Sequence, residues 1–395
     1  PYTVPSYSLT GDLLSYLSCG LQYRYQNRGE LPPSRPVQLW FGQFIHGAME
    51  EAYRRWAETP KDFPWPKQDV QDIGNTVIRR LAAKGVQFQR FLVLGIALER
   101  ALGSINQLGP LLFPLITEAE VRLSGTRGLP GGVPRVVRQS DYYEVTGVVD
   151  VIAANQLAPA AAGNPLAAEM AAAGAGVEVI VDYKGMRRPA SNDPANETWK
   201  HHEWQVLTYA WLRARQTGSL TVRGALLLYL NEISPGTEDM DQLHLEVVKS
   251  TPAVTEVLPN DEDLEALRRW PEDKKEWARR LREWEPQVRE WWRTGKDRGE
   301  LFSSFPSLPR PLSLDFLRRR ATRVIKVDEA AIERSLASFD DVVEEIEMSV
   351  VNEVATGRLI ANWKPVPRDE SCTICDFNNF CPAPGNRYRG APTAP

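Results

Sequence analysis

The sequence predicts an α/β fold in which a mixed central sheet is flanked by helices. Two segments rich in β-branched residues, 142–154 and 177–184, have the pattern of strands, because valines alternate with other residues along the second one. Segments with helical spacing of apolar residues, such as 39–58 and 199–216, come before and after these strands. At 395 residues the chain is long enough to bury a substantial core.

The composition is that of an ordinary globular protein without a strong overall charge. Hydrophobic residues make up 43% and charged residues 25% of the chain. The 47 Lys and Arg against 51 Asp and Glu give a formal net charge of −4, so a polyanion must be met by a local basic patch. The start lacks a signal-like pattern, and no segment approaches the roughly 18 uninterrupted apolar residues of a membrane span. We therefore expect a cytoplasmic protein that does not associate with membranes.

Residues 1–110 are expected to form an N-terminal helical part. Cys19 lies on or just after the first helix of this part, and His46 and Glu50, four residues apart, share one face of the second. Gly85 and Gly95 are weak points at which the third apolar segment can divide into two helices. The apolar residues have helical spacing over 13–21, 39–58 and 69–107.

Residues 111–250 are expected to form the sheet core. The first two strands, 115–123 and 142–154, are separated by a Gly- and Pro-rich loop over 125–138. The alanine-rich segment 155–176 is interpreted as an insertion at a hairpin tip, helical or disordered. We expect that insertion to be mobile and to carry no chemistry.

The rest of the sheet core is expected to follow the strand 177–184. Helix 199–216 comes first, and then two strands, 225–230 and 243–248. A Ser-Pro-Gly turn at 234–236 makes the last two strands a hairpin candidate.

Residues 251–325 are expected to form a helical insertion with a tryptophan repeat. The favoured interpretation is a seam that docks the insertion on the main body, with Pro271 and Pro286 breaking the helix. The alternative is that the indole rings, beside Arg279, Arg280 and Arg282, stack nucleic-acid bases. The tryptophans stand at seven-residue intervals: Trp270, Trp277, Trp284 and Trp291.

Residues 326–395 are expected to contain a helix, 329–355, that leads to a cysteine cluster. Cys372, Cys375 and Cys381 form a compact set of soft ligands, and Cys19 is the only other cysteine in the chain. This is no disulfide framework, whereas four thiolates suit Zn²⁺ or an iron–sulfur cluster. The remaining alternative is reduced cysteines without metal. If Cys19 joins the set, the site ties the two ends of the chain together.

Two acidic motifs lie on the central strands. Asp150 closes Gly147-Val-Val-Asp, and Asp182 opens Asp-Tyr-Lys184. If the two strands pair as a hairpin, Asp150 lies beside Asp182, while the period of two places Lys184 on the same face as Asp182. Two carboxylates make an open site for Mg²⁺, and the lysine can orient or deprotonate an attacking water. The alternative is a charged pair exposed on an edge strand.

Taken in series, these motifs resemble the RecB-like branch of the PD-(D/E)XK nucleases. The nearest likeness is to its iron–sulfur members, which include the AddB nuclease domain and the CRISPR-associated adaptation exonucleases. Gly20 departs from the pattern, because proline is more usual after the first cysteine. The matching residues, in order, are Ser6, Ser8, Tyr16, Cys19, His46, Gly147, Asp150, Asp182, Lys184, Gln205, Tyr209, Cys372, Cys375 and Cys381.

The resemblance implies a restriction-endonuclease-like core and a role for each motif. His46, Asp150, Asp182 and the Tyr183 main-chain carbonyl are implied to hold Mg²⁺ or Mn²⁺, with Lys184 at the attacking water. Gln205 and Tyr209, one helical turn apart, face the same way and can contact a phosphate or hold Lys184. The cysteines are implied to hold a [4Fe–4S] cluster, with Zn²⁺ as the alternative. Weaker candidates are Arg187 and Arg188 as phosphate contacts and Glu50, Glu120, His201, His202 and Glu203 as supporting groups.

The function implied is that of a Mg²⁺- or Mn²⁺-dependent deoxyribonuclease. We expect an exonuclease that acts on single-stranded or end-bearing DNA, in DNA repair and recombination or in antiviral CRISPR defence, beside a helicase or defence protein. One alternative is a non-catalytic, DNA-binding iron–sulfur scaffold subunit of such a complex. The other is a zinc-stabilised adaptor that docks a protein through the tryptophan segment.

Overall fold

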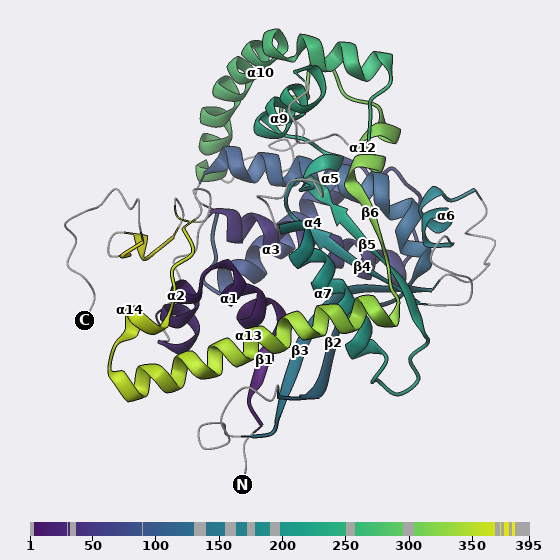
Figure 1. The fold of residues 1–395 in the computed structure, drawn as a ribbon. Coiled ribbons are helices and arrows are strands. Elements are labelled where there is room, and N and C mark those ends of the chain that lie inside the picture. Colours follow the sequence, from purple (N-terminus) through teal and green to yellow (C-terminus); the bar gives the residue numbers. More distant parts are fainter. Residues whose placement is uncertain are drawn as a thin grey trace.

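A six-stranded mixed sheet forms the centre of the computed structural model, so the predicted α/β class is confirmed (Figure 1). The strand order is β1-β3-β4-β5-β6. Strands β1 and β4 pair with different parts of β3, and β2 pairs with β3 along its other edge. The strands are β1 Ser6–Ser8, β2 Ile116–Gly128, β3 Tyr142–Ala154, β4 Glu178–Lys184, β5 Val222–Tyr229 and β6 Thr322–Lys326. The structure describes residues 4–29, 31, 37–88, 90–129, 140–154, 163–171, 178–189, 198–249, 257–294, 304–367, 372, 375–378 and 381–383.

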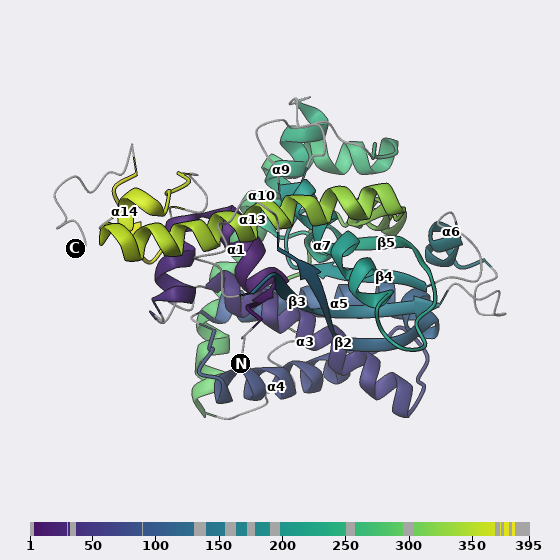
Figure 2. The ribbon, with the colours of Figure 1, turned by 60° about the horizontal axis from the view of Figure 1, so that its bottom comes forward.

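Helices cover both faces of the sheet and bury a separate apolar cluster on each. On one face lie α3, α4 and α5, and on the other α7 and α13, which Figure 2 shows on opposite sides of the strands. The helices are η1 Leu9–Leu13, α1 Leu14–Ser18, α2 Gly20–Tyr23, η2 Arg24–Arg28, α3 Val37–Glu58, α4 Lys67–Ala83, α5 Phe91–Leu112, η3 Phe113–Leu115, α6 Pro165–Ala171, α7 Thr198–Arg213, α8 Leu230–Ile233, α9 Thr237–Val248, α10 Asp261–Thr294, α12 Leu314–Ala321, α13 Glu329–Thr356 and α14 Leu359–Asn362.

Strands β3 and β4 pair antiparallel, as the hairpin prediction required. The paired residues run from Ala154 opposite Glu178 to Val151 opposite Val181. Strand β5 then runs parallel to β4, because α7 carries the chain back across the sheet between them. The last residue pair between β3 and β4 is Val151 with Val181, so this ladder ends one residue before Asp150 and Asp182.

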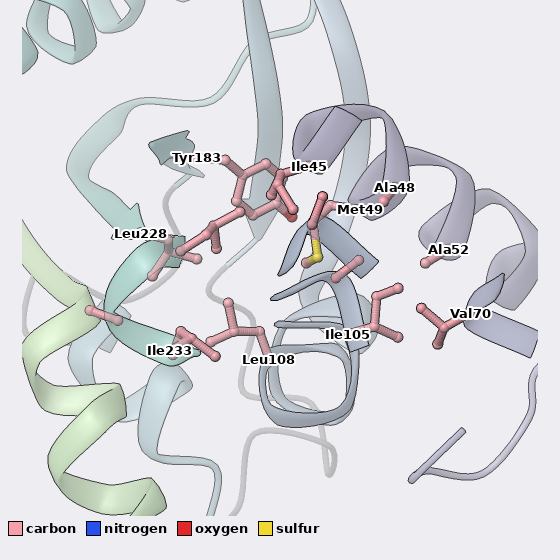
Figure 3. Close-up of a cluster of buried hydrophobic side chains, with 14 of the residues drawn as sticks. Ile45, Ala48, Met49, Ala52, Val70, Ile105, Leu108, Tyr183, Leu228 and Ile233 are labelled. Carbon is pink, nitrogen blue, oxygen red and sulfur yellow. The ribbon is translucent and has the colours of Figure 1, made fainter. Parts of the chain in front are cut away.

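Helix α3 is held against the sheet by its apolar face. Ile45, Ala48 and Met49 are completely or almost completely buried, and they belong to the same apolar cluster as Tyr183 of β4, whose ring lies beside Ile45 (Figure 3). Helix α5 contributes Leu108 to the same cluster. By length and composition α5 is the one helix in the described ranges apolar enough to cross a membrane, yet half of its most apolar window is buried inside the protein. Helix α5 therefore packs in this cluster as a core helix does.

Helix α10 docks on the main body through its tryptophans, as the favoured interpretation held. Trp270, Trp277 and Trp284 are only 3 to 4% exposed, so these rings offer no face to a base. At Gly95 of α5 a Cβ atom would lie 2.5 Å from the Trp284 ring. Gly95 is therefore a contact point inside a continuous helix, and the divide falls at Gly85, after α4.

The predicted break in this helix is wrong. Helix α10 runs unbroken from Asp261 to Thr294 with Pro271 and Pro286 inside it. The seam explains this, because burial of the apolar face offsets the hydrogen bonds that proline removes.

The predicted strand 243–248 and its hairpin are also wrong, because α9 occupies this segment. Met240 and Leu243 are buried and Val247 packs against the same core, which is helical spacing. The Asp239 carboxylate accepts a hydrogen bond from the Gly236 N–H at 2.8 Å and fixes the start of the helix. The alternating apolar residues that indicated a strand were coincidental.

Two further predictions about connecting segments need correction. The loop placed over 125–138 begins later, because β2 continues to Gly128, and residues 130–139 lie outside the described ranges. In the alanine-rich segment, α6 buries Leu166 and Met170 in the core, so the expectation of a mobile insertion is wrong for this helix. The flanking residues 155–162 and 172–177 are outside the described ranges.

Candidate active site and cysteine cluster

Asp150 and Asp182 face each other where β3 and β4 separate. Beyond the last ladder pair, Val151 with Val181, the Tyr183 N–H donates to Asp150 Oδ2 at 2.7 Å. In an extended strand the N–H and C=O of one residue point to the same side, so the Tyr183 carbonyl is also directed toward β3. The backbone of β3 and β4 therefore brings both acids next to Tyr183, as the sequence predicted.

The alternation of side chains along β3 is interrupted at Asp150. Val149 belongs to the apolar cluster under α7, whereas Val151 belongs to the cluster under α3. On the paired strand β2, Glu120 has φ +52°, a left-handed conformation that is unfavourable for a residue with a side chain. The Asp150 side chain leaves the sheet at this irregular point.

His46 reaches the site from α3. Its Nδ1 lies 3.4 Å from Asp150 Oδ1, and its side chain is 34% exposed. Burial lowers the pKa of His46, but the charges of Asp150 and Asp182 outweigh that effect, so its pKa is raised. The neighbouring core residues Ile45 and Met49 fix the helix that presents this imidazole.

Lys184 is held by a chain of polar groups from α7. Its Nζ donates to Gln205 Oε1 at 2.5 Å and lies 2.7 Å from Asp182 Oδ2. Gln205 Nε2 donates to Asp182 Oδ1 at 3.3 Å and to the Tyr209 hydroxyl at 3.0 Å. A Cβ atom on Gly147 would lie 2.6 Å from the Tyr209 ring. The glycine thus leaves the space that the tyrosine fills.

The two carboxyl groups differ in their electrostatic surroundings. Burial raises the pKa of Asp150, but His46, the Tyr183 N–H and Lys184 together bring it below its ordinary value. Burial raises the pKa of Asp182, and despite the opposing effect of Lys184 the charge of Asp150 keeps it raised. The pair therefore carries a charge that a cation would stabilise.

The two acids, His46 and Lys184 all line one open cavity of about 820 Å³, the active-site cavity. Gly147, Gln205 and Tyr209 line it as well. Its other end is bounded by Thr10 of η1, Arg122 and Ser124 of β2, and Thr146 and Val148 of β3. The structure therefore brings together the predicted catalytic side chains in one place that an extended ligand can reach.

The donor set suits a hard divalent cation. Two carboxylates, an imidazole and a carbonyl surround the end of the β3–β4 ladder, and the Asp182 carboxylate among them is buried. Lys184 Nζ lies 2.7 Å from Asp182 Oδ2 and offsets part of the negative charge of the acid pair. In the conformation observed, no group of three or more His, Cys, Asp and Glu side chains in the described ranges is arranged to hold a metal ion.

Arg187 and Arg188 are engaged inside the protein. Arg187 lies 3.0 Å from Glu246 and 3.4 Å from Glu232. Arg188 donates from Nη1 to the Thr322 carbonyl at 2.8 Å. Their role as phosphate contacts stays a prediction, since these interactions compete with a substrate for the same guanidinium groups.

The weaker candidates are dispersed around the site. His202 is buried, with Nδ1 3.1 Å from the Tyr229 hydroxyl, and burial followed by the charge of Lys184 lowers its pKa to about 2. Glu50 and Glu120 line a separate cavity next to Asp150. His201 is buried on α7, and Glu203 approaches Arg323 at 3.9 Å.

One residue of the cavity was missed by the sequence reasoning. Arg122 is an exposed cation on β2 that lines the active-site cavity. Exposed and less exposed side chains alternate along this strand, as in any half-buried strand. The sequence does not reveal which of the two faces adjoins the acids.

The four cysteines come within electrostatic range of one another. Burial raises the pKa of Cys375, and the thiols of Cys19, Cys381 and Cys372 raise it further. None of the four is in a disulfide. Cys19 lies between α1 and α2, while the others follow α14, so the set joins both ends of the chain.

Aromatic contacts and close backbone packing fix the two cysteine-bearing ends of the chain against each other. Trp363 is completely buried, with its ring centroid 6.1 Å from that of Tyr23. The Tyr25 and Phe377 ring centroids are 4.7 Å apart. A Cβ atom on Gly20 would lie 3.3 Å from the Lys364 carbonyl oxygen, so the C-terminal segment crosses directly over the residue after Cys19.

Comparisons with known proteins point to one family. The family model for the PD-(D/E)XK nuclease superfamily matches residues 11–156 and 173–382, which is most of the chain. The crystal structure of SSO0001 is similar at 13% identity, covering 92% of this chain and 94% of that chain, with a TM-score of 0.26. No curated protein matches the chain.

Proposed function

Because the chain belongs to the PD-(D/E)XK nuclease superfamily, we propose that it hydrolyses phosphodiester bonds of DNA at Asp150, Asp182 and Lys184. The observation that carries this proposal is the convergence of both acids, the lysine and His46 on the active-site cavity. An acid pair with an amine at its edge is a constellation suited to attack by water on a phosphate.

The proposed metal site uses groups from three elements. His46 of α3, Asp150 of β3, and Asp182 with the Tyr183 carbonyl of β4 would hold Mg²⁺ or Mn²⁺. When bound, such an ion lowers the pKa of an attacking water and offsets negative charge on the phosphate. The burial of Asp182 beside the charge of Asp150 supports this assignment, because a bound cation would relieve the repulsion between the two carboxylates.

Lys184 is proposed to position the attacking water or to take its proton. The Gln205 amide holds the lysine at 2.5 Å and is itself held by Asp182 and Tyr209, so the Lys184 nitrogen has one defined place. Burial keeps the pKa of Tyr209 well above its ordinary value, so the phenol stays protonated. Gln205 and Tyr209 thus act as positioning residues for Lys184.

The finer proposal is an exonuclease of the RecB-like, iron–sulfur type. It would act on single-stranded or end-bearing DNA, in repair and recombination or in antiviral defence, beside a helicase or defence protein. The gathering of Cys19, Cys372, Cys375 and Cys381 supports a [4Fe–4S] cluster there, with Zn²⁺ as the alternative.

The test is cleavage of end-labelled single-stranded and duplex DNA with Mg²⁺ or Mn²⁺. We expect the wild-type protein to release short products, and Asp182→Asn and Lys184→Ala each to lower the rate at least about a hundredfold, because each removes a group acting in the transition state. Thermal unfolding of each variant would verify that the fold is intact.

Matched controls are Asp62→Asn and Lys275→Ala, which make the same changes at exposed positions outside the cavity. Both should cleave at the wild-type rate. A wild-type rate in Asp182→Asn or Lys184→Ala would refute the assignment. A wild-type protein that binds DNA without cleaving it would leave the scaffold alternative.

A further inference from the structure

The active-site cavity extends beyond the acids along the β2–β3 ribbon. Arg122 pairs with Val148 in the antiparallel register, two residues before Asp150, and Ser124 pairs with Thr146. Thr10 of η1 is exposed and lines the same cavity from outside the ribbon. This end, bounded by Thr10, Arg122, Ser124 and Thr146, is called the ribbon groove below.

Arg122 is the cation that stands without a counter-charge in this groove. It is exposed, and it has no ion-pair or hydrogen-bond partner in the part of the chain that the structure describes. The other basic groups near the acids are engaged: Lys184 with Asp182, and Arg187 with Glu232 and Glu246. A guanidinium placed in this way matches the geometry of a phosphate group.

Among the residues that the structure describes, the groove provides hydroxyl groups but no aromatic surface for stacking bases. Thr10, Ser124 and Thr146 can donate to phosphate or sugar oxygens. Apart from His46, which lies beside the acids, the aromatic residues that line the cavity are Tyr183 and Tyr209, which are only 5% and 2% exposed. Proteins usually hold the bases of a single strand by stacking them on aromatic rings. Without such rings, the groove can contact a nucleic acid mainly through its sugar–phosphate backbone.

We propose that the ribbon groove binds the sugar–phosphate backbone of the DNA strand next to the cleaved bond, with Arg122 contacting a phosphate, so that binding is independent of sequence. This inference rests on the proposed function. It adds a substrate-binding residue, Arg122, that lies two residues along the ribbon from the acids and outside the metal site.

The test measures binding and cleavage separately. Fluorescence anisotropy with a labelled oligothymidylate and a labelled strand of mixed sequence is recorded in EDTA over a series of salt concentrations. Arg122→Gln should weaken binding of both strands about fivefold at low salt and lower the slope of log K against log salt by roughly 0.7, the loss of one phosphate contact. With Mn²⁺ present, KM should rise by a similar factor while kcat changes little.

Two variants serve as controls. Arg122→Lys keeps the charge and should keep the wild-type salt slope. Arg79→Gln removes an exposed arginine of α4 outside the cavity and should bind as the wild-type protein does.

The proposal is overturned if Arg122→Gln keeps the wild-type salt slope, if Arg79→Gln loses as much affinity, or if only one of the two strands is affected. A wild-type protein that does not cleave would contradict the proposed function through the cleavage assay, independently of this comparison of affinities.

Discussion

At the scale of single residues, the group of side chains that holds Lys184 is closely packed. Gly147 and Tyr209 are the clearest pair, because the ring occupies the place of a Cβ atom. The same ring carries the hydroxyl that Gln205 contacts, and Gln205 in turn holds Lys184. A change at Gly147 therefore reaches Lys184 through two contacts.

We predict that Gly147→Ala destabilises the protein by about 1–3 kcal/mol, the usual cost of overpacking a core. The added methyl group would meet the Tyr209 ring at 2.6 Å, and the ring cannot retreat without disturbing Gln205. Urea unfolding measures the difference. Gly128→Ala is the control, since a Cβ atom there has nothing within 4 Å. Equal stability of the two variants would contradict the packing argument.

At the scale of elements, α3 must be fixed because it carries His46 to the sheet. Besides its apolar face, α3 is joined to α4 by a buried carboxylate. Glu51, with a side chain 1% exposed, accepts hydrogen bonds from Arg54 at 2.7 Å and Arg55 at 2.8 Å, and from Arg80 of α4 at 2.6 Å. Although burial raises the pKa of Glu51, these arginines lower it to about 2.

We predict that this joint weakens in acid. A carboxyl group whose folded-state pKa is lowered stabilises the fold above its unfolded pKa and loses that effect as pH falls through the folded value. For Glu51 this pH window runs from the ordinary pKa of 4.5 down to about 2. The contribution is on the order of 3 kcal/mol at neutral pH.

The measurement is the free energy of unfolding of the wild-type protein and of Glu51→Gln from neutral to acid pH. Their difference should shrink through that window. Glu58→Gln, at a position of α3 whose side chain is 63% exposed, is the control and should differ little from the wild-type protein at any pH. A wild-type to Glu51→Gln difference that stays constant would contradict the prediction.

At the scale of the whole molecule, the two ends of the chain are brought together. Cys19 belongs to the N-terminal segment and Cys372, Cys375 and Cys381 to the C-terminal one, and α13 spans the distance between the sheet and this junction (Figure 1). Arg24 and Glu353 form an ion pair at 2.6 Å beside the aromatic contacts. A cluster bound there would close nearly the whole chain into a loop.

We predict that protein purified without oxygen contains iron and sulfide, and that Cys19→Ser loses both. The expected loss of stability is about 3–5 kcal/mol by analogy with a covalent link that closes a long loop. Iron and sulfide analysis with denaturant unfolding tests this. Cys375→Ser should behave like Cys19→Ser, and Ser18→Ala should retain its iron. Stoichiometric zinc in place of iron would decide for the alternative metal.

The sequence determined the local features of this protein. The α/β class, the strands that carry Asp150 and Asp182, and the helix of Gln205 and Tyr209 follow from periodicity, which is a property of neighbouring residues. Local rules failed where tertiary contacts overrode them: the alternation of apolar residues in α9, and the helix-breaking effect of proline in α10.

Only the tertiary structure decided which groups meet. The end of the β3–β4 ladder and the internal pairing of Arg187 arise from contacts between residues far apart in the chain. The same contacts leave Arg122 unpaired, among the described residues, in the cavity. No local pattern encodes such contacts, because they depend on strand register and on which charged groups the fold places together.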